Sequence, residues 1–239
     1  MRPADLRVRT APEIVDAGVQ LARRNYTVLM MAAAIPLLPY FAFDVAIAWT
    51  GSDMTWPWMI FTIACASIAD AAVAYAAAEA WHGREPSAAA ALRAVRSRLW
   101  PVLATGLYRT IFVLGGLMLL IAPGLILLSM YALIPGIAVL EPTLGAGAAL
   151  RRSRALTAGW RWQAFVCHAL PYVFAVGANM LVSRLLTDIG GRLLGGVGGS
   201  LVDVAITPFV IGIQVVLYFD LRIRKEGYDV EAMLAATAA

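Results

Sequence analysis

Three ionisable side chains stand out by their depth in the long apolar segments of this 239-residue sequence, and they are its strongest candidates for chemistry. Asp70 is near the middle of one segment, Arg109 is in the next segment, and Asp203 opens the last. A lone charge in the hydrocarbon layer of a membrane is costly, so such residues usually pair or line water. Because Asp70 and Arg109 fall on neighbouring antiparallel segments at similar depth, we expect them to meet.

Two interpretations of this pair stay open at the level of sequence. It can be a buried ion pair that fixes how two helices pack, or it can be a site for an ion, a proton or a lipid head group. The second interpretation predicts that Asp70→Asn abolishes a flux while the protein still inserts.

The residue types do not indicate a metal site or a catalytic nucleophile. A zinc site needs three or four converging ligands, and the two histidines, His82 and His168, have no nearby cluster of acids or thiols. We expect each to be an interfacial histidine whose ring nitrogens are hydrogen-bonded. Ser129 and Ser153 lack an adjacent His and acid partner, which a serine nucleophile requires. We therefore expect no metal, no cofactor and no enzymatic activity.

Composition places these residues in a membrane protein. Hydrophobic residues make up 61% of the chain and charged residues only 14%, against roughly a quarter charged in soluble proteins. The apolar blocks also reach the length of about 20 residues that a membrane-spanning helix needs. The sequence predicts an all-α, polytopic membrane helix bundle.

We predict six spans, with a short and broken fourth one. The fourth is bounded by Pro123-Gly124 and Glu141-Pro142 and interrupted at Pro135-Gly136, so a tilted or partly re-entrant segment is the alternative. The predicted spans are 26–49, 56–81, 101–122, 125–140, 163–186 and 201–221. They form one transmembrane domain, 26–223, between an N-terminal segment, 1–25, and a tail, 224–239.

The basic residues orient this bundle. Of the 19 Lys and Arg residues, all but Arg109, Arg184 and Arg192 fall in the N-terminal segment, the second and fourth connections, or the tail. By the positive-inside rule, both termini are cytoplasmic in a cell membrane, which we take to be a bacterial inner membrane. The net charge of +4 then indicates contact with anionic lipid rather than with nucleic acid. The predicted lipid contacts are Arg23, Arg24, Arg93, Arg96, Arg98, Arg151, Arg152, Arg154, Arg222, Arg224 and Lys225.

A weak repeat precedes the first, third and fifth spans. Each has a helical, arginine-ended segment of roughly a dozen residues before it, and the first begins with a capping box from Thr10 to Glu13. Their periodicity suits helices lying in the head-group plane. The architecture is then three units, each a cytoplasmic interfacial amphipathic helix followed by a transmembrane hairpin.

Three segments, 11–25, 149–159 and 219–231, resemble the membrane domain found beside some bacterial glycerophosphodiester phosphodiesterases and also as free-standing proteins. In the fused proteins a separate barrel domain carries the hydrolysis, and nothing in this sequence corresponds to it. The resemblance implies a free-standing membrane domain without phosphodiesterase activity.

The leading functional hypothesis is a non-enzymatic membrane protein that acts through lipid or protein-partner contacts at the cytoplasmic face. It rests on the arginine clusters. The rival hypothesis is a small transporter or channel that uses the Asp70 and Arg109 region.

Overall fold

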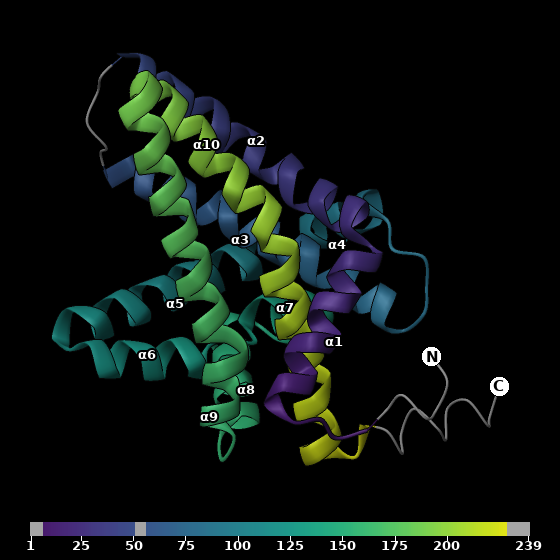
Figure 1. Cartoon of the computed structure of the whole chain (residues 1–239). Helices are drawn as coiled ribbons and strands as arrows, with labels where there is room; N and C mark the ends of the chain where they lie inside the picture. The colour runs from purple at the N-terminus through teal and green to yellow at the C-terminus, as the bar shows by residue number, and fades with distance from the viewer. Residues whose placement is uncertain (1–6, 51–55, 229–239) are drawn as a thin grey trace.

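The computed structural model describes residues 7–50 and 56–228, and in these ranges the chain folds into helices joined by short turns (Figure 1). The helices are α1 (Ala11–Arg24), α2 (Tyr26–Thr50), α3 (Trp56–Trp81), α4 (Ala88–Ser97), α5 (Leu99–Leu119), α6 (Ile121–Met130), α7 (Ile134–Leu140), α8 (Ala146–Thr157), α9 (Arg161–Ala164), the π-helix η2 (Phe165–Ala169) and α10 (Leu170–Glu226). Five segments are long and apolar enough to cross a membrane. The all-α membrane bundle is confirmed.

The fifth of these segments, from Arg161 to Glu226, is folded into a hairpin. Gly190 and Gly191 have non-helical backbone angles, and Gly191 adopts a positive φ of 78° that favours glycine. The chain reverses there, so the side-chain amide of Asn179 donates to the carbonyl of Gly199 at 2.9 Å. Figure 1 shows the two arms of α10, 170–189 and 192–226, side by side. The predicted fifth and sixth spans, 163–186 and 201–221, lie before and after this turn.

The glycine-rich stretch after this turn is helical. Its glycines let the two arms of α10 approach closely. A Cβ atom on Gly195 would lie 1.9 Å from the hydroxyl of Thr187, and one on Gly199 would lie 2.2 Å from the hydroxyl of Ser183. Small residues at helix contacts are typical of membrane bundles.

Three amphipathic helices each precede a hairpin, and the third joint is longer because Ala158 and Gly159 also lie between α8 and α9. The residue directly before each hairpin has nearly the same helix-breaking angles. These residues are Asn25 (φ −117°, ψ 19°), Arg98 (φ −121°, ψ 22°) and Trp160 (φ −122°, ψ 23°). The same backbone conformation at three positions supports an internal repeat that the sequence shows only weakly.

The amphipathic helix α1 packs on protein rather than presenting its apolar face to lipid. Ile14, Gly18 and Ala22 are buried against the C-terminal arm of α10. A Cβ on Gly18 would lie 2.5 Å from the Cα of Ile213, so the two backbones are in contact. Arg9 meets Asp220 at one end of α1 and Tyr26 meets Ala205 beyond the other, so α1 runs antiparallel to this arm.

The fourth crossing is divided differently from the predicted one. The turn after α5 is Leu120, so Pro123 lies in the first turn of α6, and Pro135 lies in the first turn of α7. Prolines fit there because the first amides of a helix have no partner in the helix. The break is at 131–133, where the hydroxyl of Ser153 donates to the carbonyl of Met130 at 2.8 Å. Ser153 thus gives the Met130 carbonyl a hydrogen-bond donor that the broken helix does not supply.

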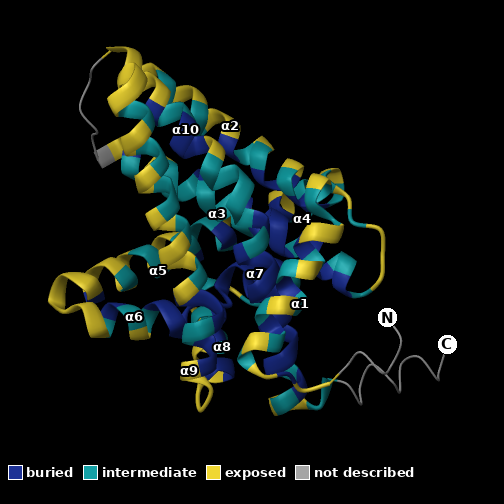
Figure 2. Ribbon diagram, in the orientation of Figure 1, coloured by how far each residue is buried: buried dark blue, intermediate teal, exposed yellow. Residues whose placement is uncertain are grey.

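Burial divides the molecule into a core and projecting hairpins. Residues 210–221 of α10 are all buried, and Figure 2 shows dark blue residues gathered around α7 and α1. The tip of the α5–α6 hairpin is exposed and apolar, as a lipid-facing surface must be. In Figure 1 this hairpin projects to the left, below the end where α2 and α10 turn.

Candidate functional site

A cavity of about 490 Å³ lies among α2, α3, α5, α6 and both arms of α10. Asp70, Arg109 and Asp203 all line it, so the structure gathers the three predicted site residues around one space. Its other polar lining residues are Tyr40, Thr62, Ser67, Thr110, Tyr172, Asn179, Thr207 and Gln214. The rest of the lining is mainly aliphatic, as in most small-molecule sites.

Asp70 and Arg109 meet across the contact of α3 with α5, as the sequence predicts. The guanidinium Nη1 of Arg109 lies 3.5 Å from Oδ2 of Asp70. The helices come close here because Gly106 faces Ser67, and a Cβ on Gly106 would lie 1.9 Å from the Ser67 hydroxyl. The separation exceeds the 2.7–2.9 Å or so of a close charge-assisted hydrogen bond. The two side chains retain 25% and 14% exposure, so the pair is open to the cavity.

Asp203 lines the same cavity but does not meet this pair. It stands eleven positions before Gln214 on α10, which places it about 16 Å further along the helix axis. Beside it on the same arm, the Ser200 hydroxyl donates to Oδ2 of Asp44 on α2 at 3.3 Å. The cavity therefore has an ion pair at one level and a carboxylate at another.

Gln214 is a lining residue that sequence reasoning missed. Its side chain is only 4% exposed, and its Oε1 has no hydrogen-bond partner among the described residues. A buried polar atom without a partner is uncommon, because it loses its hydration without replacement. The one sign of this residue in the sequence is a side-chain amide in the otherwise apolar run from Phe209 to Phe219.

His168 is fully buried beside the cavity, contrary to the expectation of a satisfied interfacial histidine. Neither ring nitrogen has a hydrogen-bond partner in the described part of the chain. It belongs to the π-helix η2, and its ring lies 5.9 Å from that of Tyr172, a lining residue. The guanidinium of Arg109 lies 6.0 Å from the same Tyr172 ring. Wide turns of this kind are frequent at functional sites.

His82 is satisfied, as we expect. Its ring nitrogens contact the carbonyl of Ala78 at 2.7 Å and the hydroxyl of Tyr228 at 2.9 Å. Burial lowers the pKa of this imidazole, so the neutral form is favoured. Among the described residues, no group of three or more His, Cys, Asp or Glu side chains could hold a metal ion.

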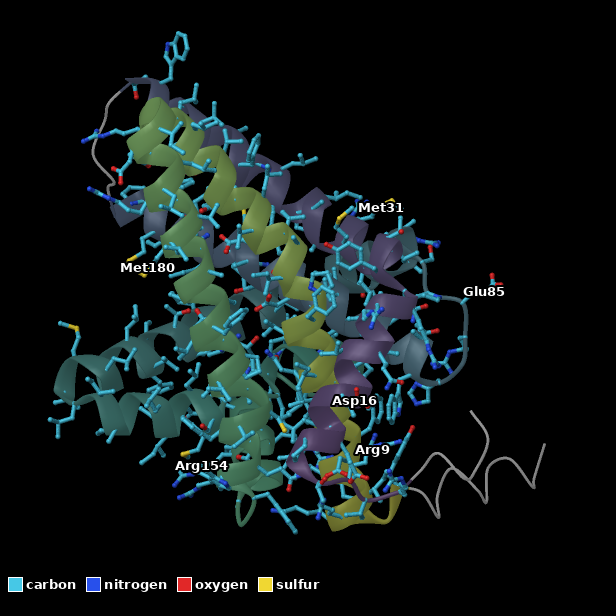
Figure 3. The ribbon with its side chains drawn as sticks, in the orientation of Figure 1. Arg9, Asp16, Met31, Glu85, Arg154 and Met180 are labelled. Atoms are coloured by element: carbon cyan, nitrogen blue, oxygen red, sulfur yellow. The ribbon has the colours of Figure 1, made fainter. Side chains whose placement is uncertain are left out.

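The predicted lipid-contacting cations fall into two sets. The exposed set is on α1, α4 and α8: Arg23, Arg24, Arg93, Arg96, Arg151 and Arg154. Figure 3 shows Arg154 near the same end of the molecule as Arg9. The other set makes contacts inside the protein: Arg98, Arg152, Arg222, Arg224 and Lys225. Arg224 and Lys225 belong to α10 rather than to a separate tail.

Arg152 is the centre of the second set. Its guanidinium pairs with Glu141 at 3.1 Å and also contacts Glu226, which in turn accepts from Arg222 at 2.9 Å. The hydrogen bond that Arg152 donates to Glu226 raises the pKa of Arg152 further above its usual range. This guanidinium links α8 to α10 and to the end of α7, so it serves the fold rather than the lipid.

No family model, curated protein sequence or solved structure matches this chain. The cavity and the charged surface are therefore the grounds on which its function is argued.

Proposed function

We propose that this chain binds a small amphiphilic molecule inside the membrane, as a binding or transport protein. The observation that carries the proposal is that Asp70, Arg109 and Asp203, from three different crossings, line one cavity. A buried ion pair that only fixed helix packing would need no such space. We therefore favour the hypothesis of an intramembrane site over the hypothesis of a lipid-binding surface.

The lining indicates the kind of ligand. About 490 Å³ is within the range of roughly 300–1,000 Å³ of small-molecule pockets. Aliphatic walls suit an apolar body, whereas the Asp70–Arg109 pair and the unpartnered Gln214 oxygen suit a polar group.

Binding of a lipophilic ion tests this proposal. Tritiated tetraphenylphosphonium and tetraphenylborate have nearly the same shape and opposite charge, and a scintillation-proximity assay detects only probe held by immobilised protein. We expect saturable binding of at least one probe, at one site per chain. If neither probe binds saturably, the proposal is wrong.

A matched pair of substitutions locates that binding. Val176 and Val173 are both exposed on the same arm of α10, but only Val176 lines the cavity. Val176→Trp should fill part of the space and weaken binding about tenfold or more, whereas Val173→Trp should leave it unchanged. Equal effects of the two substitutions would assign the binding to the lipid-facing surface instead.

A second proposed role belongs to the exposed arginines on α1, α4 and α8, as a surface for anionic lipid. The same clusters support a bacterial inner membrane location with both termini cytoplasmic, because positive loops favour that side. Each basic residue near an anionic leaflet contributes about 1 kcal/mol. A protein partner on this face, the absence of enzymatic activity and the resemblance to phosphodiesterase-associated membrane domains stay predictions.

Lipid binding by this surface has its own test. Replacing Arg151 and Arg154 with Gln, while keeping the internally paired Arg152, should lower retention of tritiated phosphatidylglycerol and leave phosphatidylcholine unaffected. The control carries Arg184→Gln and Arg192→Gln, which remove two exposed charges near the turn of α10. If both double variants lose phosphatidylglycerol equally, the surface on α8 has no special role.

A further inference from the structure

The charges that line the cavity do not balance. Asp70 is opposite Arg109, whereas Asp203 has no salt bridge within the described ranges. The one ion pair between described residues near the turn of α10 joins Arg184 to Asp188 at 3.3 Å, and both side chains are largely exposed. The cavity thus carries two carboxylates against one guanidinium.

A further carboxylate strengthens this imbalance. Asp44 accepts from Ser200, which stands three positions before Asp203 and therefore on a neighbouring part of the same helical face. A Cβ on Gly196 would lie only 3.0 Å from Oδ2 of Asp44, so this carboxylate lies directly against the C-terminal arm of α10. Two acidic side chains, from α2 and α10, consequently flank one end of the cavity.

Aromatic rings lie in the same lining. Tyr40 stands one helical turn before Asp44 on α2 and lines the cavity, where its ring stacks on Trp58 at 5.3 Å. A tyrosine face attracts an organic cation through the quadrupole of the ring. Arg109, at the level of Asp70, repels a cation and directs it toward Asp203.

We infer that the cavity takes a lipophilic organic cation, with its charge beside Asp203 and its apolar body against the aliphatic walls. This inference rests on the proposed intramembrane binding function and adds the charge class of the ligand. The physical reason is that an uncompensated carboxylate in an apolar membrane interior is costly, and a bound cation supplies the missing charge.

Comparing the binding of the two oppositely charged probes tests whether the cavity prefers a cation. At equal ionic strength, tetraphenylphosphonium should bind at least about tenfold more tightly than tetraphenylborate. Asp203→Asn, which keeps the side-chain shape, should weaken tetraphenylphosphonium binding about tenfold. The matched control is Asp188→Asn, which removes an exposed charge on the same helix outside the cavity and should leave binding unchanged.

The possible failures are distinguishable. Preference for tetraphenylborate, equal binding of the two probes, or a loss as large in Asp188→Asn as in Asp203→Asn would overturn the cation inference and leave the binding function standing. Absence of saturable binding for both probes would remove the proposed function itself. Normal elution of each variant in size-exclusion chromatography verifies that a loss of binding is not a loss of folding.

Discussion

At the scale of single residues, Asp220 ties distant parts of the chain together. It is fully buried, and it accepts hydrogen bonds from the backbone of Arg9 at 2.7 Å and from the guanidinium of Arg224 at 2.6 Å. The amide of Gln163 lies 3.4 Å from it. A single carboxylate therefore fixes the segment before α1 to the last turns of α10.

Removing this charge should destabilise the protein. In Asp220→Asn the Arg224 guanidinium loses its counter-ion, and we expect a loss of about 2–4 kcal/mol in the free energy of unfolding. Equilibrium unfolding in mixed dodecyl sulfate micelles measures it. Glu85→Gln, an exposed substitution, is the control and should change stability little. Equal stability of the two variants would show that the buried carboxylate contributes nothing.

Glu13 gives a prediction of pH dependence at the start of α1. The backbone amide of Thr10 and the Arg7 guanidinium hold the pKa of this carboxyl at about 2, below its usual 4.5. Because the folded pKa is the lower one, the capping interaction is fully present above about 4.5 and is lost as the pH falls toward 2. The hydrogen-exchange protection factors of the first amides of α1, which compare the observed rate with the intrinsic rate at the same pH, should fall over that window in the wild type. Glu13→Gln should remove the pH dependence.

At the scale of elements, the contact of α1 with α10 depends on glycine. Gly18→Ala puts a methyl group against the backbone of Ile213, so the helices must separate, and overpacking of this kind costs about 1–3 kcal/mol. Gly147→Ala in α8 is the control, since its Cβ would meet only Arg151, at 3.7 Å. Unfolding in mixed micelles should show a loss for Gly18→Ala alone. A neutral Gly18→Ala would mean that the contact is looser than described.

Sequence periodicity predicts the elements well because each amphipathic helix and each crossing is a local pattern. The three units and the Asp70–Arg109 contact follow from it, since neighbouring antiparallel helices bring residues of equal depth together. The cavity does not follow, because its volume depends on how far the α5–α6 hairpin diverges from α2 and α10. Gln214 was missed for a related reason, since an isolated amide in an apolar run has no local partner to mark it.

At the scale of the whole molecule, the charged residues near the chain ends connect segments far apart in sequence. Arg152 pairs with Glu226, and Asp220 accepts a hydrogen bond from the backbone amide of Arg9. Such partners cannot be read from local patterns, which is why the sequence predicts lipid contact for arginines that the protein itself uses. Both ends of the described chain consequently meet at one end of the molecule, as an even number of crossings requires.

The hairpin in α10 decides that number, and labelling of single cysteines tests it. Ala158 precedes the hairpin and Arg192 follows its turn, and both positions are exposed, whereas Cys65 and Cys167 are buried. In intact bacterial cells a membrane-impermeant thiol reagent should label Arg192→Cys, and it should label Ala158→Cys only after permeabilisation. The wild type should remain unlabelled. One crossing separates the two positions if the chain reverses at Gly190 and Gly191, so equal labelling of both in intact cells would contradict the six-crossing arrangement.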